Sequence, residues 1–215
     1  MEGVRRLLLV AAAALAAVAA SAAATVPAPA PGPLGPEGVP IPKGPVLANV
    51  QPVKRGQTIA GVTCQPVEKI AFHTHAHLTV FADGKAYQVP YGIGIGQPLQ
   101  GQNTPSGAFV GSGSCFTWLH THASDGIIHM EAPKQMSFTL GQFFAVWGIP
   151  LGSSRVGPQK GKVTAFYNGK AWTKDPASIP LTNEAQIQLD VGSPVVAPQH
   201  IVFPKGLAAQ RPKSK

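Results

Sequence analysis

The sequence predicts a mainly β protein: a compact sandwich or open barrel of hairpins with one short α-helix at about residues 139–148. Turn pairs of the Asp-Gly or Asn-Gly type separate β-prone runs at 83–84, 125–126 and 168–169. Only one window has apolar residues at helical spacing. The chain has 215 residues, enough for one ordinary domain once its two ends are set aside.

The two chain ends are expected to lie outside this domain. Arg5 and Arg6 precede an alanine-rich apolar stretch that ends in small residues, so we predict a secretory signal peptide at 1–24. The uncharged stretch is also about long enough to span a bilayer, so an uncleaved tether is the alternative. Residues 25–47 are proline-rich and predict an extended linker. A single domain is expected at 48–204 and a basic tail at 205–215.

These features predict a secreted or extracytoplasmic protein. Its two cysteines, Cys64 and Cys115, favour a disulfide in an exported chain. The crosslink would close a loop of about 50 residues and stabilise the folded state by about 4 kcal/mol. The alternative is that Cys115 is a thiolate ligand. The net charge of +8 favours anionic cell-envelope polymers as a partner. The basic residues are scattered without an aromatic-rich motif, so no specific nucleic-acid partner is expected, and no second segment predicts a membrane span.

The first hairpin is expected at residues 70–87, around its turn pair at 83–84. Its first strand contains His73, His75 and His77. Since side chains alternate between the two faces of a strand, these three imidazoles are predicted to share one face.

The second hairpin, at 118–131, repeats this arrangement. With 125–126 as a two-residue turn, His122 is predicted opposite His129, and His120 opposite Glu131. Paired positions have Cβ atoms roughly 5 Å apart. Three imidazoles and a carboxylate therefore converge on one patch.

The helix is predicted from its N-terminal signals. Thr139 is an expected N-cap, and Gln142 completes a capping box. Gly148 is expected to end the helix. After it, residues 163–172 match residues 78–87 at a constant offset, which predicts another hairpin, and the alternating pattern at 185–191 predicts a half-buried strand.

The two histidine clusters together predict transition-metal binding, either at one site that both clusters share or at two adjacent sites. Six facing imidazoles would repel one another when protonated, which favours a bound cation. Imidazole ligands suit zinc or copper; Met130 alternates away from the site and is expected in the core. The candidate ligands, in falling order, are His122 and His129, then His75, His77 and His120, and then His73.

Glu131 is predicted as a ligand, as a group that orients a ligand, or as a general base. His200 stands alone and is expected to be structural or exposed. The motifs His-x-His-x-His-Leu at 73–78 and Leu-His-Thr-His-x-x-x-Gly-Ile-Ile-His-x-Glu at 119–131, with Gly-Gln-Phe-Phe-x-x-Trp-Gly at 141–148, resemble a family of exported bacterial proteins without an assigned function. This resemblance covers roughly residues 70–195 and implies no activity.

Three functions are compatible with these observations. The first is an exported histidine-rich protein that captures zinc or copper or maintains its supply. The second is an extracytoplasmic metalloenzyme in which three histidines hold the ion and Glu131 is the general base. The third is a non-catalytic envelope module with a structural metal.

Overall fold

The computed structural model describes residues 24–207 and confirms a mainly β protein with a short helix. Its centre is a seven-stranded mixed sheet with the order β16-β15-β18-β4-β10-β9, in which β5 also pairs with β4. All pairings are antiparallel except the parallel pairing of β18 with β4. The strands of this sheet are β4 (Phe72–Ala82), β5 (Lys85–Tyr87), β9 (Leu119–His120), β10 (Ile127–Ala132), β15 (Val163–Tyr167), β16 (Lys170–Trp172) and β18 (Ala185–Val191).

Five small sheets surround the central one, and the sheets do not close into a barrel. They pair β1 (Thr25–Val26) with β19 (Val195–Val196), β6 (Gln100–Thr104) with β7 (Gly107–Ser112), β11 (Phe138–Thr139) with β17 (Pro180–Leu181), β2 (Thr58–Ile59) and β8 (Phe116–Thr117) with β3 (Val62–Gln65), and β12 (Leu151–Gly152) and β14 (Gln159–Lys160) with β13 (Arg155–Val156). Short 3-10 helices lie at η1 (Pro176–Ser178) and η2 (Lys205–Leu207).

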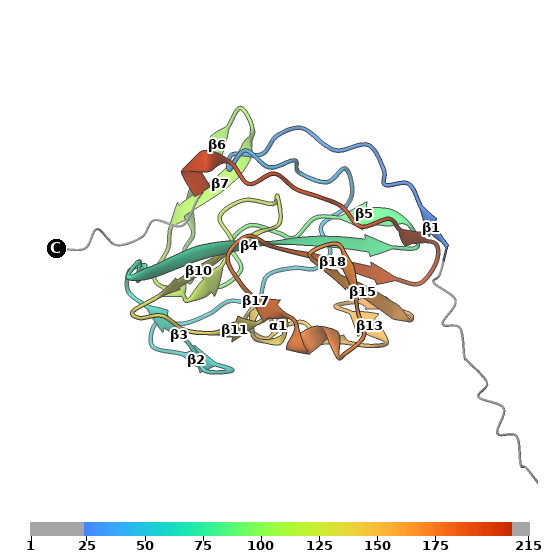
Figure 1. The fold of residues 1–215 in the computed structure, drawn as a ribbon. Helices are drawn as coiled ribbons and strands as arrows, with labels where there is room; N and C mark the ends of the chain where they lie inside the picture. The colour runs from blue at the N-terminus through green and yellow to red at the C-terminus, as the bar shows by residue number, and fades with distance from the viewer. Residues whose placement is uncertain (1–23, 208–215) are drawn as a thin grey trace, which may run out of the picture.

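The two faces of the central sheet differ in chemistry. On one face, Ala76, Leu78 and Val80 of β4 pack into the apolar core with helix α1 (Leu140–Trp147). On the opposite face, the N-terminal and C-terminal segments of the described chain cross over β4 (Figure 1). The strict alternation along β4 places its histidines on this second face.

Helix α1 forms as predicted. Thr139 is its N-cap in an extended conformation, and the reciprocal hydrogen bonds with Gln142 complete the capping box. Gly148 ends the helix in the left-handed conformation, with φ of 80°. Its apolar side chains bury against the sheet, and none is placed for chemistry. The buried residues are Leu140, Phe143, Phe144, Val146 and Trp147.

Two of the three predicted turn pairs form two-residue hairpins. Asp83 and Gly84 have φ of 48° and 73°, and Asn168 and Gly169 have φ of 49° and 76°. Positive φ at both positions is what a type I′ turn requires. The first turn joins β4 to β5 and the second joins β15 to β16.

The third turn pair corrects our predicted register. His129 lies opposite His120, not His122, and Glu131 does not face His120 in the ladder. The loop from 121 to 126 is wider because the pairing of β9 with β10 ends at His120, and Thr121 instead exchanges backbone hydrogen bonds with residues 92–93. The slip is two residues, so the predicted face of each side chain is unchanged.

The proline-rich segment also differs from our prediction of a linker outside the domain. Its β1 pairs with β19, and Val46 forms a bridge with Gln88. Val39 and Leu47 are buried. Residues 25–47 therefore pack against the rest of the described chain instead of forming an extended linker outside it.

The predicted disulfide between Cys64 and Cys115 is present and joins β3 to the segment before β8. Because both sulfurs are bonded to each other, the alternative of Cys115 as a thiolate ligand is wrong. The predicted signal peptide, except for residue 24, and residues 208–215 of the predicted tail lie outside the described residues. Between residues 24 and 207, no helix is long and apolar enough to cross a membrane.

Candidate metal centre

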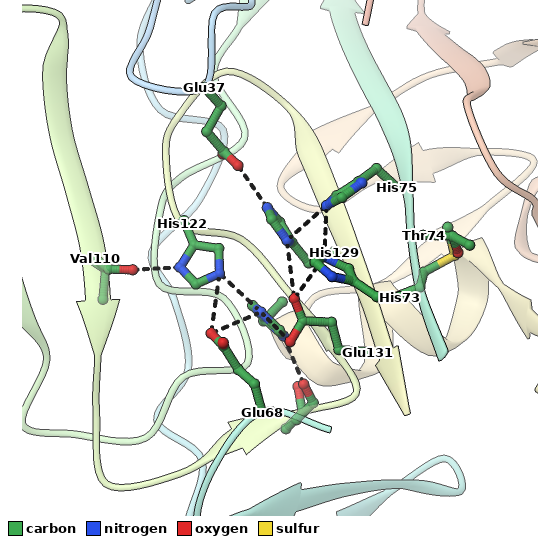
Figure 2. A network of polar contacts seen from close by, with 12 residues as sticks. Glu37, Glu68, His73, Thr74, His75, Val110, His122, His129 and Glu131 are labelled. Carbon is green, nitrogen blue, oxygen red and sulfur yellow. Dashed lines mark hydrogen bonds and ion pairs between the residues drawn. The ribbon is translucent and has the colours of Figure 1, made fainter. Parts of the chain in front are cut away.

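The candidate centre lies where three neighbouring strands each present histidines on the same face. In the ladder between β4 and β10, His75 pairs with His129 and His73 with Glu131. On the other side of β10, His129 pairs with His120. The period-2 pattern of each strand therefore brings side chains distant in sequence into one cluster (Figure 2).

One half of the cluster gathers around His129. The Nε2 atoms of His73 and His75 are 3.0 Å apart, and His75 Nε2 is 3.1 Å from His129 Nδ1. Glu131 Oε1 lies 3.0 Å from His73 Nε2 and 3.4 Å from His129 Nδ1. His129 Nε2 donates to Glu37 Oε1 at 2.7 Å, which leaves Nδ1 to face the cluster.

The other half consists of His120, His122 and Glu68. His120 Nδ1 donates to the carbonyl of Thr117 at 2.8 Å, and His122 Nδ1 donates to the carbonyl of Val110. A carbonyl only accepts hydrogen bonds, so both protons are fixed on Nδ1 in the neutral rings.

The Nε2 lone pairs of His120 and His122 therefore face each other at 3.1 Å. Glu68 Oε1 lies 3.5 Å from His122 Nε2 and 3.9 Å from His120 Nε2. Two neutral acceptors at this distance repel unless a cation lies between them. Histidine ligands of metals have this arrangement, with the remote N–H held by a carbonyl or a carboxylate.

Glu131 links the two halves. Its Oε1 faces His73 and His129, and its Oε2 is 4.0 Å from His120 Nε2. Oε2 is buried and has no hydrogen-bond partner among residues 24–207. Two groups have ligand atoms close enough to hold an ion: His120, His122, His129 and Glu131, and His73, His75 and His129.

The electrostatics favour unprotonated donors. Burial, followed by the neighbouring imidazoles, lowers the pKa of His75 to about 3, and burial also holds the pKa values of His120 and His122 below their usual value. Burial would raise the pKa of Glu131, but hydrogen bonds from His129 and His73 outweigh it and hold that pKa well below its usual range. The cluster thus combines the ionised Glu131 carboxylate with neutral imidazoles at His75, His120 and His122.

His129 is the exception among the imidazoles. Burial lowers its pKa, but the hydrogen bonds with Glu131 and Glu37 outweigh this and raise the pKa to about 9. A cation that binds Nδ1 must therefore displace a proton, and Glu37 would then keep the ring in the orientation required of a ligand.

The cluster opens into a pocket of about 490 Å³. The N-terminal segment closes one side with Pro36 and Glu37, and the C-terminal segment contributes Pro204 and Leu207. The Glu68 side chain is 33% exposed, so the centre is buried but reachable from solvent.

Sequence reasoning missed Glu37 and Glu68. Glu37 is the only acidic residue in the proline-rich segment, and that isolated carboxylate was the available signal. Glu68 follows Cys64 by four residues as His120 follows Cys115 by five, so the predicted disulfide already indicated that these two regions are close.

Three other side chains are placed away from the cluster. His77 Nε2 donates to the carbonyl of Asp125 at 2.8 Å, and its Nδ1 accepts from Thr79 Oγ1 at 3.3 Å, so both nitrogens are engaged. Met130 lies in the apolar core, as predicted. His200 is exposed.

Comparisons with protein-family models, with curated proteins and with solved structures find no match to this chain. The resemblance to exported bacterial proteins therefore stays a prediction. The fold and the cluster together define a β-rich, disulfide-bonded protein whose buried His and Glu side chains can hold a metal ion.

Proposed function

We propose that this protein is an exported metal-binding protein that captures a transition-metal ion, zinc or copper, outside the cytoplasm. The observation that carries the proposal is the pair of Nε2 lone pairs on His120 and His122, 3.1 Å apart with both Nδ1 protons held by carbonyls. In a tetrahedral site with metal–nitrogen bonds of about 2.0–2.1 Å, two ligand nitrogens are about 3.3 Å apart. The pair is therefore close to a chelating geometry.

The donor set supports zinc or Cu(II) as the ion. Both cysteine sulfurs are in the disulfide, Met130 lies in the core and Met136 packs against it, so among residues 24–207 no sulfur ligand accompanies the imidazoles. Imidazole and carboxylate donors suit zinc and Cu(II), whereas Cu(I) prefers thiolate and thioether ligands. The disulfide and the predicted signal peptide support a location outside the cytoplasm.

Metal titration of the purified protein tests the proposal. We expect zinc or Cu(II) to bind stoichiometrically and to raise the thermal midpoint, because an ion that binds only the folded state stabilises it. His122→Ala should weaken binding, and His200→Ala is the matched control because His200 is exposed. The proposal fails if neither ion binds and neither ion changes the thermal midpoint.

A second candidate function is a metalloenzyme, favoured by the pocket at the cluster. Glu68 is partly exposed, and burial raises its pKa above the usual value, so we move the proposed general-base role from Glu131 to Glu68. A bound ion would act there as a Lewis acid. Metal-dependent hydrolysis of a small ester that is lost in Glu68→Gln, while at least one metal ion per chain is retained, would favour this candidate over capture. If the protein shows no metal-dependent hydrolysis, the metalloenzyme candidate is wrong, and metal capture or a structural metal is the remaining function.

A further inference from the structure

We propose that the centre is dinuclear, with the Glu131 carboxylate bridging two metal ions. The inference rests on the proposed metal-binding function and extends it to the number and arrangement of ions. Glu131 lies between two sets of imidazoles and directs one oxygen to each (Figure 2).

The first set holds four donors arranged in a ring: His73 Nε2, His75 Nε2, His129 Nδ1 and Glu131 Oε1. Adjacent donors are 3.0 Å (His73–His75), 3.1 Å (His75–His129), 3.0 Å (His73–Glu131) and 3.4 Å (His129–Glu131) apart. These separations are near the value of about 3.3 Å expected between ligand atoms of one tetrahedral ion.

The second set holds His120 Nε2, His122 Nε2, Glu68 Oε1 and Glu131 Oε2. The two nitrogens are 3.1 Å apart. Glu68 Oε1 lies 3.5 Å from His122 Nε2 and 3.9 Å from His120 Nε2, and Glu131 Oε2 lies 4.0 Å from His120 Nε2. This set is looser than the first, and Glu68 is its solvent-facing member. We assign it as the site where an ion enters and leaves.

The number of donors exceeds what a single ion takes. The two sets contain five imidazole nitrogens and three carboxylate oxygens, whereas zinc is almost always four-coordinate in proteins. An ion in the first set alone would leave the Nε2 lone pairs of His120 and His122 facing each other. Two ions satisfy both sets.

Glu131 is the bridging residue because the other shared side chain cannot bridge. His129 belongs to both groups of potential ligands, but its Nε2 is committed to Glu37 at 2.7 Å. Glu131 Oε2, in contrast, is buried without a hydrogen-bond partner in the described part of the chain. Paired ions in dinuclear protein sites are about 3.5–4 Å apart, a separation that a carboxylate can span.

The number of Cu(II) ions bound per wild-type chain tests the inference without any variant. We expect two ions, and we expect the electron paramagnetic resonance signal to show a coupled pair. One ion per chain, or two magnetically independent ions, would overturn the bridge while leaving metal capture intact. A chain that binds neither Cu(II) nor zinc would overturn both.

Variants of each set test the assignment of donors. His73→Ala with His75→Ala should remove the first ion only, and His122→Ala the second only, so each protein should keep one ion. Glu131→Gln should abolish the coupling. If both sets of variants instead lose all metal while remaining folded by circular dichroism, the donors serve one shared ion and the dinuclear assignment is wrong.

Discussion

His77 gives the metal-free protein a pH-dependent stability that substitution should remove. This side chain is 3% exposed, and burial lowers its pKa to about 4 despite the hydrogen bond to Asp125. In the unfolded chain its pKa returns to about 6.5. The folded state thus resists protonation, and the stability from neutral His77 is full above about pH 6.5 and falls as the pH drops toward 4.

The size of the loss follows from the two pKa values. At pH 5 the unfolded chain binds a proton at His77 and the folded chain largely does not. The free energy of unfolding is therefore about 2 kcal/mol lower at pH 5 than at pH 7.5. This loss of unfolding free energy is measured by urea unfolding of the metal-free wild type and the metal-free His77→Gln variant at both pH values. The difference in unfolding free energy between the two proteins should shift by about 2 kcal/mol in favour of the variant at pH 5.

The comparison has an internal control and a clear refutation. Glutamine does not titrate, so other groups, including His75 and His129, contribute equally to both proteins and cancel. If the stability difference between wild type and His77→Gln is the same at pH 7.5 and pH 5, His77 is not held neutral by burial.

Further predictions concern the groups that support the centre. Glu37→Gln should weaken metal binding about 10- to 100-fold, measured by competition with a chelator, because it removes the carboxylate that orients His129; unchanged affinity would contradict that role. Replacing Cys64 and Cys115 by serine opens a loop with a sequence separation of 51 and should lower the unfolding free energy by about 4 kcal/mol; a loss near zero in urea unfolding would contradict this. Thr139→Ala should cost about 1 kcal/mol by the same assay, through loss of the N-cap, whereas an unchanged midpoint would show that the cap contributes nothing.

The sequence predicted the elements whose determinants are local. The capping box at Thr139 and the type I′ turns at residues 83–84 and 168–169 depend on a few adjacent residues, and all three were placed correctly. The alternation along β4 likewise placed His73 and His75 on one face, and Met130 was correctly assigned to the core.

The errors came from contacts between distant segments. Asp125-Gly126 alone favours a two-residue turn, but Thr121 pairs with residues 92–93, and this widens the loop and shifts the register. The position of Glu37 depends on how residues 25–47 cross the sheet. His77 does not face the cluster because its Nε2 donates to the carbonyl of Asp125. No local pattern carries this information.

X-ray absorption spectroscopy at the edge of the bound metal tests the central claim most directly. We expect a first shell of nitrogen and oxygen at about 2.0–2.1 Å, with the outer-shell scattering of several imidazoles, and no sulfur shell at about 2.3 Å. That pattern should weaken in His120→Ala with His122→Ala and persist in His200→Ala. A sulfur shell, or a first shell without imidazole scattering, would contradict metal binding by this cluster.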